Sequence, residues 1–369
     1  NFTFFLEDSL NGDQIRQRER RFLTGYRGTW THQNTLLNRP IRLQTGVSLR
    51  LDGVKGSELS HTLNRYTVLH RHRLGDIREQ NAAAFTEARW QLSDRTTLFA
   101  GLRYDRFRFR YSDALTDAYD HLRAARGIAS PKLRLQYHAR PSLLLYAAAG
   151  TGFHSNDARV VLQETGRDIL PAAVGADLGL LWKPEKEIVV QAALWQLHMQ
   201  QEFVYVGDAG IVDPGGRTDR FGLDLSVRAR LLPSVFVDAD LNLSRARARD
   251  AGTAVHIPLA PTVTSSGGLR WAPGGRWAAA MRYRHLAARP ANESWTLTAE
   301  GYFLLDATLS YTFRRVQLSL AATNLLNAEW NAAQFETTSR LRHETAPVTE
   351  VHFTPGSPRA LNLSLSLQL

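Results

Sequence analysis

The end of the chain displays the pattern that dominates the whole sequence. In "LNLSLSLQL", residues 361–369, five leucines alternate with polar residues. A period of two residues is typical of a β-strand with one apolar and one polar face. Five leucines on one face of a strand need cover, either from a second protein layer or from lipid.

The same alternation recurs in about sixteen segments along the chain. Clear examples occupy residues 41–51, 221–231, 235–243 and 303–313. Most segments have about 9–11 residues, the length with which a tilted strand crosses a bilayer. The absence of any run of about 18 apolar residues excludes transmembrane helices. It does not exclude a transmembrane β-barrel, in which only alternate residues face lipid.

Short and long connections alternate strictly between these segments. The short turns are 93–95, 139–142, 183–186, 232–234, 273–275 and 314–315. The long polar loops are roughly 53–78, 112–127, 152–173, 206–216, 247–262, 288–300 and 325–358. One rim of an outer-membrane barrel has short periplasmic turns and the other has long extracellular loops, whereas Greek-key sandwiches do not sort their loops this way.

Aromatic residues on the apolar face lie near the ends of the predicted strands. They are Tyr104, Tyr137, Trp182, Trp271, Trp277, Tyr283, Phe303, Tyr311 and Phe313. This placement is typical of the two aromatic girdles of a membrane barrel, although aromatic residues favour strands in general. Together with the loops it predicts an all-β fold, a transmembrane antiparallel up-and-down β-barrel. Because every backbone polar group in lipid must be paired, we expect the sheet to close.

Composition narrows the function classes. No linker or change of pattern divides the 369 residues, so we predict one outer-membrane barrel domain over 1–369. The absence of cysteine excludes disulfides, thiol catalysis and thiolate metal sites. The net charge of +10 comes almost entirely from arginine, which suits phosphate and carboxylate capture, but a bias in genome composition explains it equally well. No signal peptide or initiator methionine is present, which indicates a mature or truncated chain.

No catalytic signature is present: the sequence lacks GxSxG, HExxH and a phosphate-binding glycine-rich loop. The polar strand faces carry Asp224, Asp238, Asp240 and Asp306 among many arginines. We interpret these faces as the wall of a water-filled or plugged lumen rather than as a paired-carboxylate catalytic site. We therefore predict no enzymatic activity, no catalytic residue, no cofactor and no nucleic-acid partner.

The stretch "RYDRFRFRY" at 103–111 offers a lipid-binding hypothesis. Tyr104 belongs to the lipid face, and the period of two continues that face through Arg106, Arg108 and Arg110. At this height the three arginines would meet the phosphates of lipopolysaccharide. The alternatives are plain solvation or a bulge that turns the arginines inward.

Three histidines provide the only candidate metal ligands. His61, His70 and His72 all fall within the predicted 53–78 loop. An H-x-H pair suits a transition metal, but the pair alone is not specific for one.

Three motifs resemble those of the TonB-dependent outer-membrane receptors, and they occur in the family's order. "GTGFHSNDARVV" at 150–161 opens a long outer loop. "ATNLLNAEWNAAQF" at 322–335 is similar to the family's "NLxN" signature, and "FTPGSPRALNLSLSLQL" at 353–369 is similar to its closing strand. In the first motif His154, Asn156, Asp157 and Arg159 are candidate ligand contacts, although such residues also cap turns.

The resemblance implies a barrel of about 22 strands around an N-terminal plug that is preceded by a TonB box. This sequence has fewer strands, no plug and no TonB box, and it ends in Leu369 where an aromatic residue is common. The simplest interpretation is a fragment without the plug and the first strands.

The implied function is TonB-powered import of a scarce nutrient, most often a ferric siderophore or a similar metal chelate, across the outer membrane of a Gram-negative bacterium. The implied partners are the ligand, outer-membrane lipid and lipopolysaccharide, and the TonB complex through the missing plug. A self-contained sixteen-stranded diffusion porin is the alternative. A barrel lipase or protease ranks lower, because the sequence shows no nucleophile arrangement.

Overall fold

A computed structural model describes residues 14–116, 121–155, 168–206, 211–249, 255–340 and 344–367. Over these ranges all regular secondary structure is β, and none of it is a helix long and apolar enough to cross a membrane. One sheet contains 15 strands, each antiparallel to its neighbours along the chain, and three two-stranded hairpins project from its connections. The predicted all-β, antiparallel, up-and-down topology is therefore confirmed.

The strands of the main sheet are β1 (Ile15–Leu36), β2 (Arg39–Leu63), β3 (Thr67–Gln91), β4 (Thr96–Asp113), β5 (His121–Arg140), β6 (Leu143–Phe153), β7 (Ala172–Trp182), β8 (Ile188–Met199), β11 (Thr218–Leu232), β12 (Val235–Ala248), β13 (Val263–Trp271), β14 (Trp277–Leu286), β17 (Tyr302–Phe313), β18 (Val316–Thr323) and β21 (Ala360–Leu367). The hairpins pair β9 (Glu202–Val206) with β10 (Ile211–Gly215), β15 (Arg289–Pro290) with β16 (Thr298–Ala299), and β19 (Asn331–Ser339) with β20 (Val348–Pro355).

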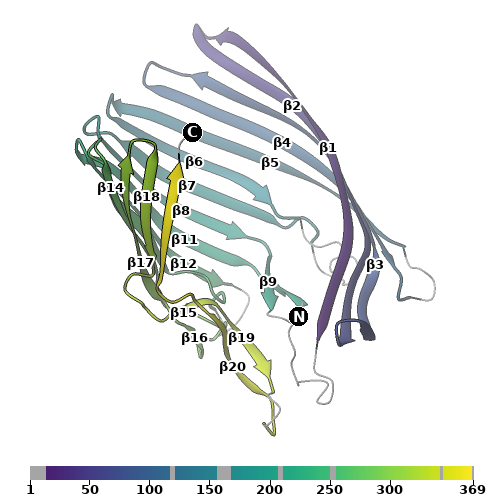
Figure 1. Ribbon diagram of the computed structural model, residues 1–369. Helices are drawn as coiled ribbons and strands as arrows, with labels where there is room; N and C mark the ends of the chain where they lie inside the picture. The colour runs from purple at the N-terminus through teal and green to yellow at the C-terminus, as the bar shows by residue number, and fades with distance from the viewer. Residues whose placement is uncertain are drawn as a thin grey trace.

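The sheet curves into an open trough rather than a closed cylinder (Figure 1). Its two edges are β1 and β21, and neither has a second partner among the described strands. The expected closure is thus not seen within this part of the chain, and the sheet has 15 strands against about sixteen predicted segments.

The two rims differ as predicted. All six predicted short turns join consecutive strands at one rim, and a seventh turn at Leu37 and Asn38 was not predicted. Leu37 and Asn38 both have left-handed backbone angles, with φ of 51° and 58°, the conformation of a two-residue hairpin turn. The opposite rim carries the long connections and the three hairpins.

The prediction of a long loop over 53–78 is wrong. Strands β2 and β3 have 25 residues each and continue through this region to a tight turn, where Asn64 and Arg65 have φ of 50° and 68°. The side chains buried in this part of β2 are mostly polar, among them Ser57, Ser60 and Thr62, so the strands continue without the apolar alternation that marks them inside the membrane. Their polar sequence therefore imitates a loop.

The leucine-bearing face points away from the trough. On β21 the side chains of Leu361, Leu363 and Leu365 are 67–72% exposed, and those of Leu318 and Leu320 on the paired strand β18 are 44% exposed. The nine predicted girdle aromatics share this outward face, with Tyr283 and Tyr311 half-buried and the other seven exposed. No described protein layer covers this face, as expected for a surface in contact with lipid.

The second and third sequence motifs bind one another. Asn324 is buried, and its side-chain amide donates to the carbonyl oxygens of Ala328 and Ser357, at 2.9 and 3.2 Å. The Trp330 indole also donates to the Ser357 carbonyl, at 3.1 Å, and lies directly over Gly356. These contacts tie the end of β18 to the segment that leads into β21, so they fix the start of the last strand.

We predict that Gly356→Ala lowers the thermal stability of the folded barrel. A Cβ at this position would overlap the Trp330 ring, and overpacking of this kind costs about 1–3 kcal/mol. Samples heated to increasing temperatures are then run on an SDS gel, and the temperature at which the compact, fast-migrating form disappears measures the effect. Gly275→Ala is the control, because a Cβ there meets no atom within 4 Å. Equal melting temperatures for the two variants would contradict the role of this contact.

Candidate functional site

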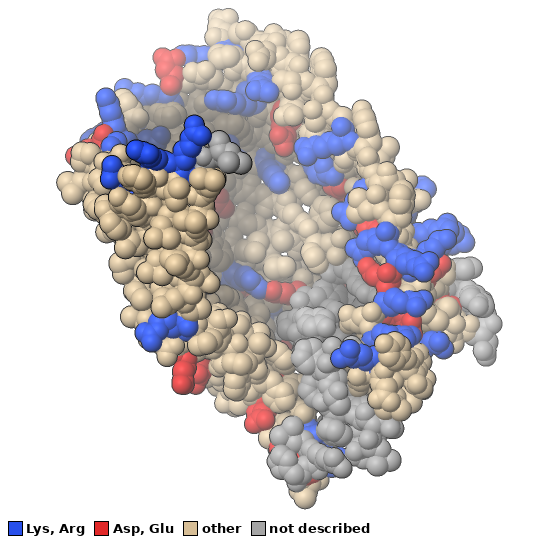
Figure 2. Space-filling view, in the orientation of Figure 1, with Lys and Arg blue, Asp and Glu red and all other residues tan. Residues whose placement is uncertain are grey.

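The concave face of the sheet is the candidate site. Figure 2 shows the hollow that this face encloses, with charged side chains on its wall. Two adjoining cavities of about 880 and 950 Å³ lie in the hollow and share Arg134. The first is lined mainly by strands β5–β14 and the second by strands β1–β8.

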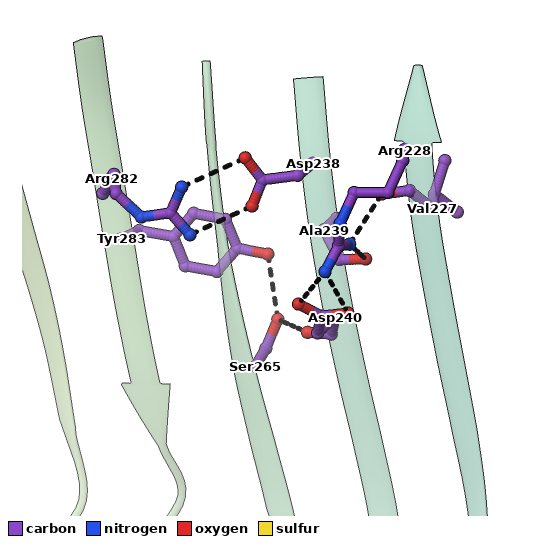
Figure 3. Close-up of polar contacts among 8 residues, drawn as sticks. All are labelled: Val227, Arg228, Asp238, Ala239, Asp240, Ser265, Arg282 and Tyr283. Carbon is purple, nitrogen blue, oxygen red and sulfur yellow. Dashed lines mark hydrogen bonds and ion pairs between the residues drawn. The ribbon is translucent and has the colours of Figure 1, made fainter. Parts of the chain in front are cut away.

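Arginine and aspartate neutralise each other on the β11–β17 side of the wall (Figure 3). Arg282 donates two hydrogen bonds to the Asp238 carboxylate, at 3.0 and 3.1 Å. Arg228 likewise contacts both carboxylate oxygens of Asp240, at 2.8 and 3.0 Å. These two-point contacts hold the guanidinium planes in place and are stronger than single hydrogen bonds.

A glycine makes one of these contacts geometrically feasible. In the strand ladders Gly268 on β13 stands between Asp238 on β12 and Arg282 on β14. A Cβ on Gly268 would come within 3.2 Å of the Arg282 guanidinium, so any larger residue would crowd the arginine that crosses it.

Tyr283 and Ser265 form hydrogen bonds on the outward, lipid-facing side of the same strands. The Ser265 hydroxyl donates to the Asp240 carbonyl at 2.9 Å and pairs with the Tyr283 hydroxyl at 2.9 Å (Figure 3). The ring of Tyr283 packs over Gly267, where a Cβ would lie 2.8 Å from it. Both polar groups on this lipid-facing side are thus hydrogen-bonded, which removes the cost of leaving them unpaired there.

The β1–β5 side of the wall is organised by phenylalanine and arginine instead. Phe99 has guanidinium groups from two neighbouring strands over its ring, with the Cζ of Arg134 at 4.2 Å and that of Arg89 at 5.6 Å from its centroid. Phe85 is placed similarly between Arg27 at 5.5 Å and Arg103 at 5.9 Å. Such cation–π contacts hold arginines in position without cancelling their charge.

This side of the wall keeps a positive excess. The second cavity is lined by the cationic residues Arg27, Arg42, Arg89, Arg103, Lys132 and Arg134 but only by the acidic residues Glu87 and Asp177. Arg103 is bound to the buried Asp105, at 2.7 Å, whereas Arg89 and Arg134 form no ion pair with any described residue. A concave, positively charged wall of this kind attracts anions.

An apolar cluster lies at the long-loop end of the same inner face. Phe107 and Phe109 on β4 pack with Ile169 and Leu170, which precede β7, and Leu170 is only 1% exposed. The chain between β6 and β7 therefore returns to the barrel by inserting two aliphatic side chains beside the aromatic pair. Asp168 strengthens this return with an ion pair to Arg126, at 3.3 Å.

The candidate ligand residues from the first motif are only partly described. His154 is exposed and its amide donates to the Pro171 carbonyl, at 3.2 Å. Asn156, Asp157 and Arg159 lie outside the described residues. Their proposed ligand contact stays a prediction.

The three candidate metal ligands lie near the tip formed by β2 and β3. His61 stands opposite His70 in the ladder, and the rings of His70 and His72 are 5.0 Å apart. The described residues nevertheless contain no group of three or more side chains placed to hold a metal ion. The structure gives the metal-site prediction no support.

His256 connects two neighbouring outer connections. Its ring accepts a hydrogen bond from Arg247 and packs edge-on against Trp295, with 4.8 Å between ring centroids. Its backbone amide donates to the Glu293 carbonyl, at 3.0 Å. Burial, followed by the charges of Arg247 and Arg245, lowers the pKa of His256 below its usual value of 6.5.

The sequence predicted which aspartates would line the lumen but not which arginines would remain unpaired. Asp238, Asp240 and Asp306 all bind arginines on the inner face, as the lumen interpretation requires. The Phe–Arg arrangements at Phe85 and Phe99 were missed, because they join residues on different strands and depend on register. The only available signal was the position of both phenylalanines on the polar face of their strands.

Comparison with known proteins identifies a matching family. The family described as "TonB dependent receptor-like, beta-barrel" matches residues 1–325. A search of curated protein sequences finds no match.

Solved structures share the fold at low sequence identity. The chain is similar to the ferric citrate transporter FecA in its unliganded form, with a TM-score of 0.78, 16% identity, and coverage of 96% of this chain and 55% of FecA. For the ferric yersiniabactin uptake receptor FyuA from Yersinia pestis the TM-score is 0.73 at 14% identity, and the match covers 96% of this chain and 55% of FyuA. For the copper transporter OprC the TM-score is 0.73 at 17% identity, and the match covers 96% of this chain and 57% of OprC. The chain therefore spans just over half the length of these proteins.

We predict that Leu170→Ser loosens the return of the chain to β7. Burial of a leucine contributes about 1.5–3 kcal/mol, so local opening should become at least about tenfold more frequent. Hydrogen exchange of the peptide that covers 168–172 measures this opening. Leu115→Ser is the control, because Leu115 is 43% exposed on a neighbouring connection. Similar exchange in both variants would contradict the packing role of Leu170.

We also predict that His256 stays neutral at pH 7 and titrates below pH 6.5. The folded protein lowers the pKa of His256, so protonation of the ring favours conformations in which it has left this site. We therefore expect the contact with Trp295 to weaken as the pH falls below about 6.5. NMR titration of the histidine ring in detergent-solubilised protein measures the pKa. A value above 6.5 would show that the burial and the arginine charges do not act as described.

Proposed function

Because the chain belongs to the TonB-dependent receptor-like β-barrel family, we propose that it is the barrel part of a receptor that imports an anionic metal chelate. Members of this family reside in the outer membrane of Gram-negative bacteria, and this protein is located there. The family consists of receptors and transporters, which are not enzymes.

The proposal includes the rest of the barrel. The edges of β1 and β21 are unpaired among the described strands, and lipid cannot pair their backbone groups, so we propose that further strands complete the cylinder in the membrane. A barrel of about 22 strands with an internal plug would satisfy this requirement, and residues 1–369 would be its C-terminal portion. The plug would then provide the contact with the TonB complex.

The positive excess on the β1–β5 wall supports an anionic cargo. Arg89 and Arg134 are held in place by Phe99 but not neutralised, so their charge remains available to a ligand. The chelates named for the similar structures include ferric citrate and ferric yersiniabactin, and copper is named for a third. A ferric siderophore or a similar metal chelate is the cargo we propose.

The sixteen-stranded porin that was the alternative receives no support. A porin needs a complete cylinder, whereas the 15-stranded sheet of the described residues ends in two unpaired edges.

The full-length protein, expressed in a Gram-negative strain that lacks its own ferric-chelate receptors, should restore uptake of radioactive iron from an anionic ferric chelate. Uptake should require TonB, because transport is energised. Arg89→Gln combined with Arg134→Gln should raise the half-saturating chelate concentration about tenfold, since the attraction of the wall is electrostatic.

Lys183→Gln with Lys186→Gln is the control, because it removes the same charge at a short turn away from both cavities. Uptake that persists without TonB would exclude the receptor mechanism. An unchanged half-saturating concentration in the arginine variant would exclude recognition of the anion by this wall.

A further inference from the structure

A group of five arginines lies on the outward face of the sheet, above the lipid-facing band. This arginine patch consists of Arg78 on β3, Arg106, Arg108 and Arg110 on β4, and Arg123 on β5. Arg110 is half-buried and the other four are exposed.

The strand register fixes the direction of these side chains. The β3–β4 and β4–β5 ladders contain no register shift, so no bulge turns Arg106, Arg108 or Arg110 inward. The intervening residues Phe107 and Phe109 are buried on the inner face. The arginines therefore continue the outward face of Leu102 and Tyr104, each of which is 50% exposed.

The register also places like charges side by side. Arg110 is the direct partner of Arg78 on one side and of Arg123 on the other. Three arginines in one row across three strands repel one another, and like charges directly opposite destabilise a sheet. An anion from outside the chain would relieve this repulsion.

No described acidic residue neutralises the arginine patch. None of the five arginines forms an ion pair with a described residue. The partners of Arg106 and Arg108 on the adjacent strands are uncharged, namely Ala82, Gly127, Gln80 and Ala125. The acidic residue next along β3, Asp76, accepts a hydrogen bond from the Gly56 amide, at 2.9 Å.

A second row of arginines on the outward face has partners within the protein. Arg245 and Arg247 follow Leu243 on the outward face of β12, and Arg249 comes directly after the end of the strand at Ala248. Arg249 is paired with Asp219, and Arg247 donates to His256. In this second row Arg249 has an acidic partner and Arg247 has a neutral hydrogen-bond partner, whereas none of the five patch arginines has an acidic partner among the described residues.

The lower part of the patch lies at the height of the polar region of the outer leaflet. Arg106 lies two residues beyond the girdle residue Tyr104, about 7 Å along the strand, and Arg110 lies about 20 Å beyond it. The headgroup region adds only about 5–7 Å to each side of the hydrocarbon core, so a tilted strand carries its first arginines through that layer.

We propose that the arginine patch binds the phosphate groups of an outer-leaflet glycolipid of the lipid A type, the anchor of lipopolysaccharide. Guanidinium groups bind phosphate through paired hydrogen bonds, and several arginines in register can bind a lipid that carries two phosphates. Leu102 and Leu133, which are exposed just below, would contact its acyl chains. This inference depends on the membrane location and not on the proposed import of a chelate.

Binding of bisphosphorylated lipid A to the full-length, detergent-purified protein tests the proposal. Arg106→Gln, Arg108→Gln and Arg110→Gln combined should weaken binding at least tenfold. The matched control replaces Arg245, Arg247 and Arg249 by Gln, which removes the same charge at the same side of the membrane, and should change binding less than twofold. Dephosphorylated lipid A should bind the unmodified protein at least tenfold more weakly than the bisphosphate.

Three outcomes would overturn the proposal. An equal loss in both variants would indicate attraction by net charge alone, and no loss in the patch variant would remove the patch as the site. Inorganic phosphate that competes at the same concentration as lipid A would assign the site to free phosphate. Replacing Arg106, Arg108 and Arg110 by lysine separates the effect of charge from that of paired hydrogen bonds. Lysine keeps the charge, so this variant should bind better than the glutamine variant but less tightly than the unmodified protein. Compact migration on an unheated gel verifies that each variant is folded.

Discussion

The structure depends on one constraint: each strand has lipid on one face and a polar hollow on the other, while its backbone groups pair only with neighbouring strands. Period-two alternation satisfies the two faces and an uninterrupted antiparallel ladder satisfies the backbone. The terminal leucines of β21 lie on the face toward lipid, and the Arg–Asp pair of β12 and β14 lies on the face toward the hollow. Ser265 and Tyr283 obey it too, because polar groups on the outward face hydrogen-bond each other.

The same constraint decides how much of the fold the sequence reveals. Where a strand crosses the membrane, alternation identifies it, and the short turns predicted at 183–186 and 314–315 follow from the gaps between strands. In residues 53–78 polar side chains occupy even buried positions, such as Ser60 and Thr62, so the sequence does not distinguish extended strands from a loop. Only pairing between β2 and β3 reveals the strands, and pairing is not a local property.

The candidate site follows a similar division. Alternation places Asp238 and Arg282 on the inner face, but their contact exists because register puts Gly268 between them. The two rings beside Arg89 and Arg103 likewise come from neighbouring strands. A sequence therefore predicts which face a charge occupies, whereas register decides whether that charge is neutralised.

Neutralisation then separates structural charges from functional ones. The arginines of β14 bind aspartates and contribute to the rigidity of the wall. Arg89 and Arg134 on the inner face and Arg110 on the outer face remain without a described acidic partner, although many other arginines have one. Uncompensated charge costs stability, and it occurs on two opposite faces of the β3–β5 segment, which is the basis for the two anion sites that we propose. The inner face would meet a soluble ligand in the lumen and the outer face a phosphate fixed in the membrane, and because the sheet lies between them the two sites can bind independently.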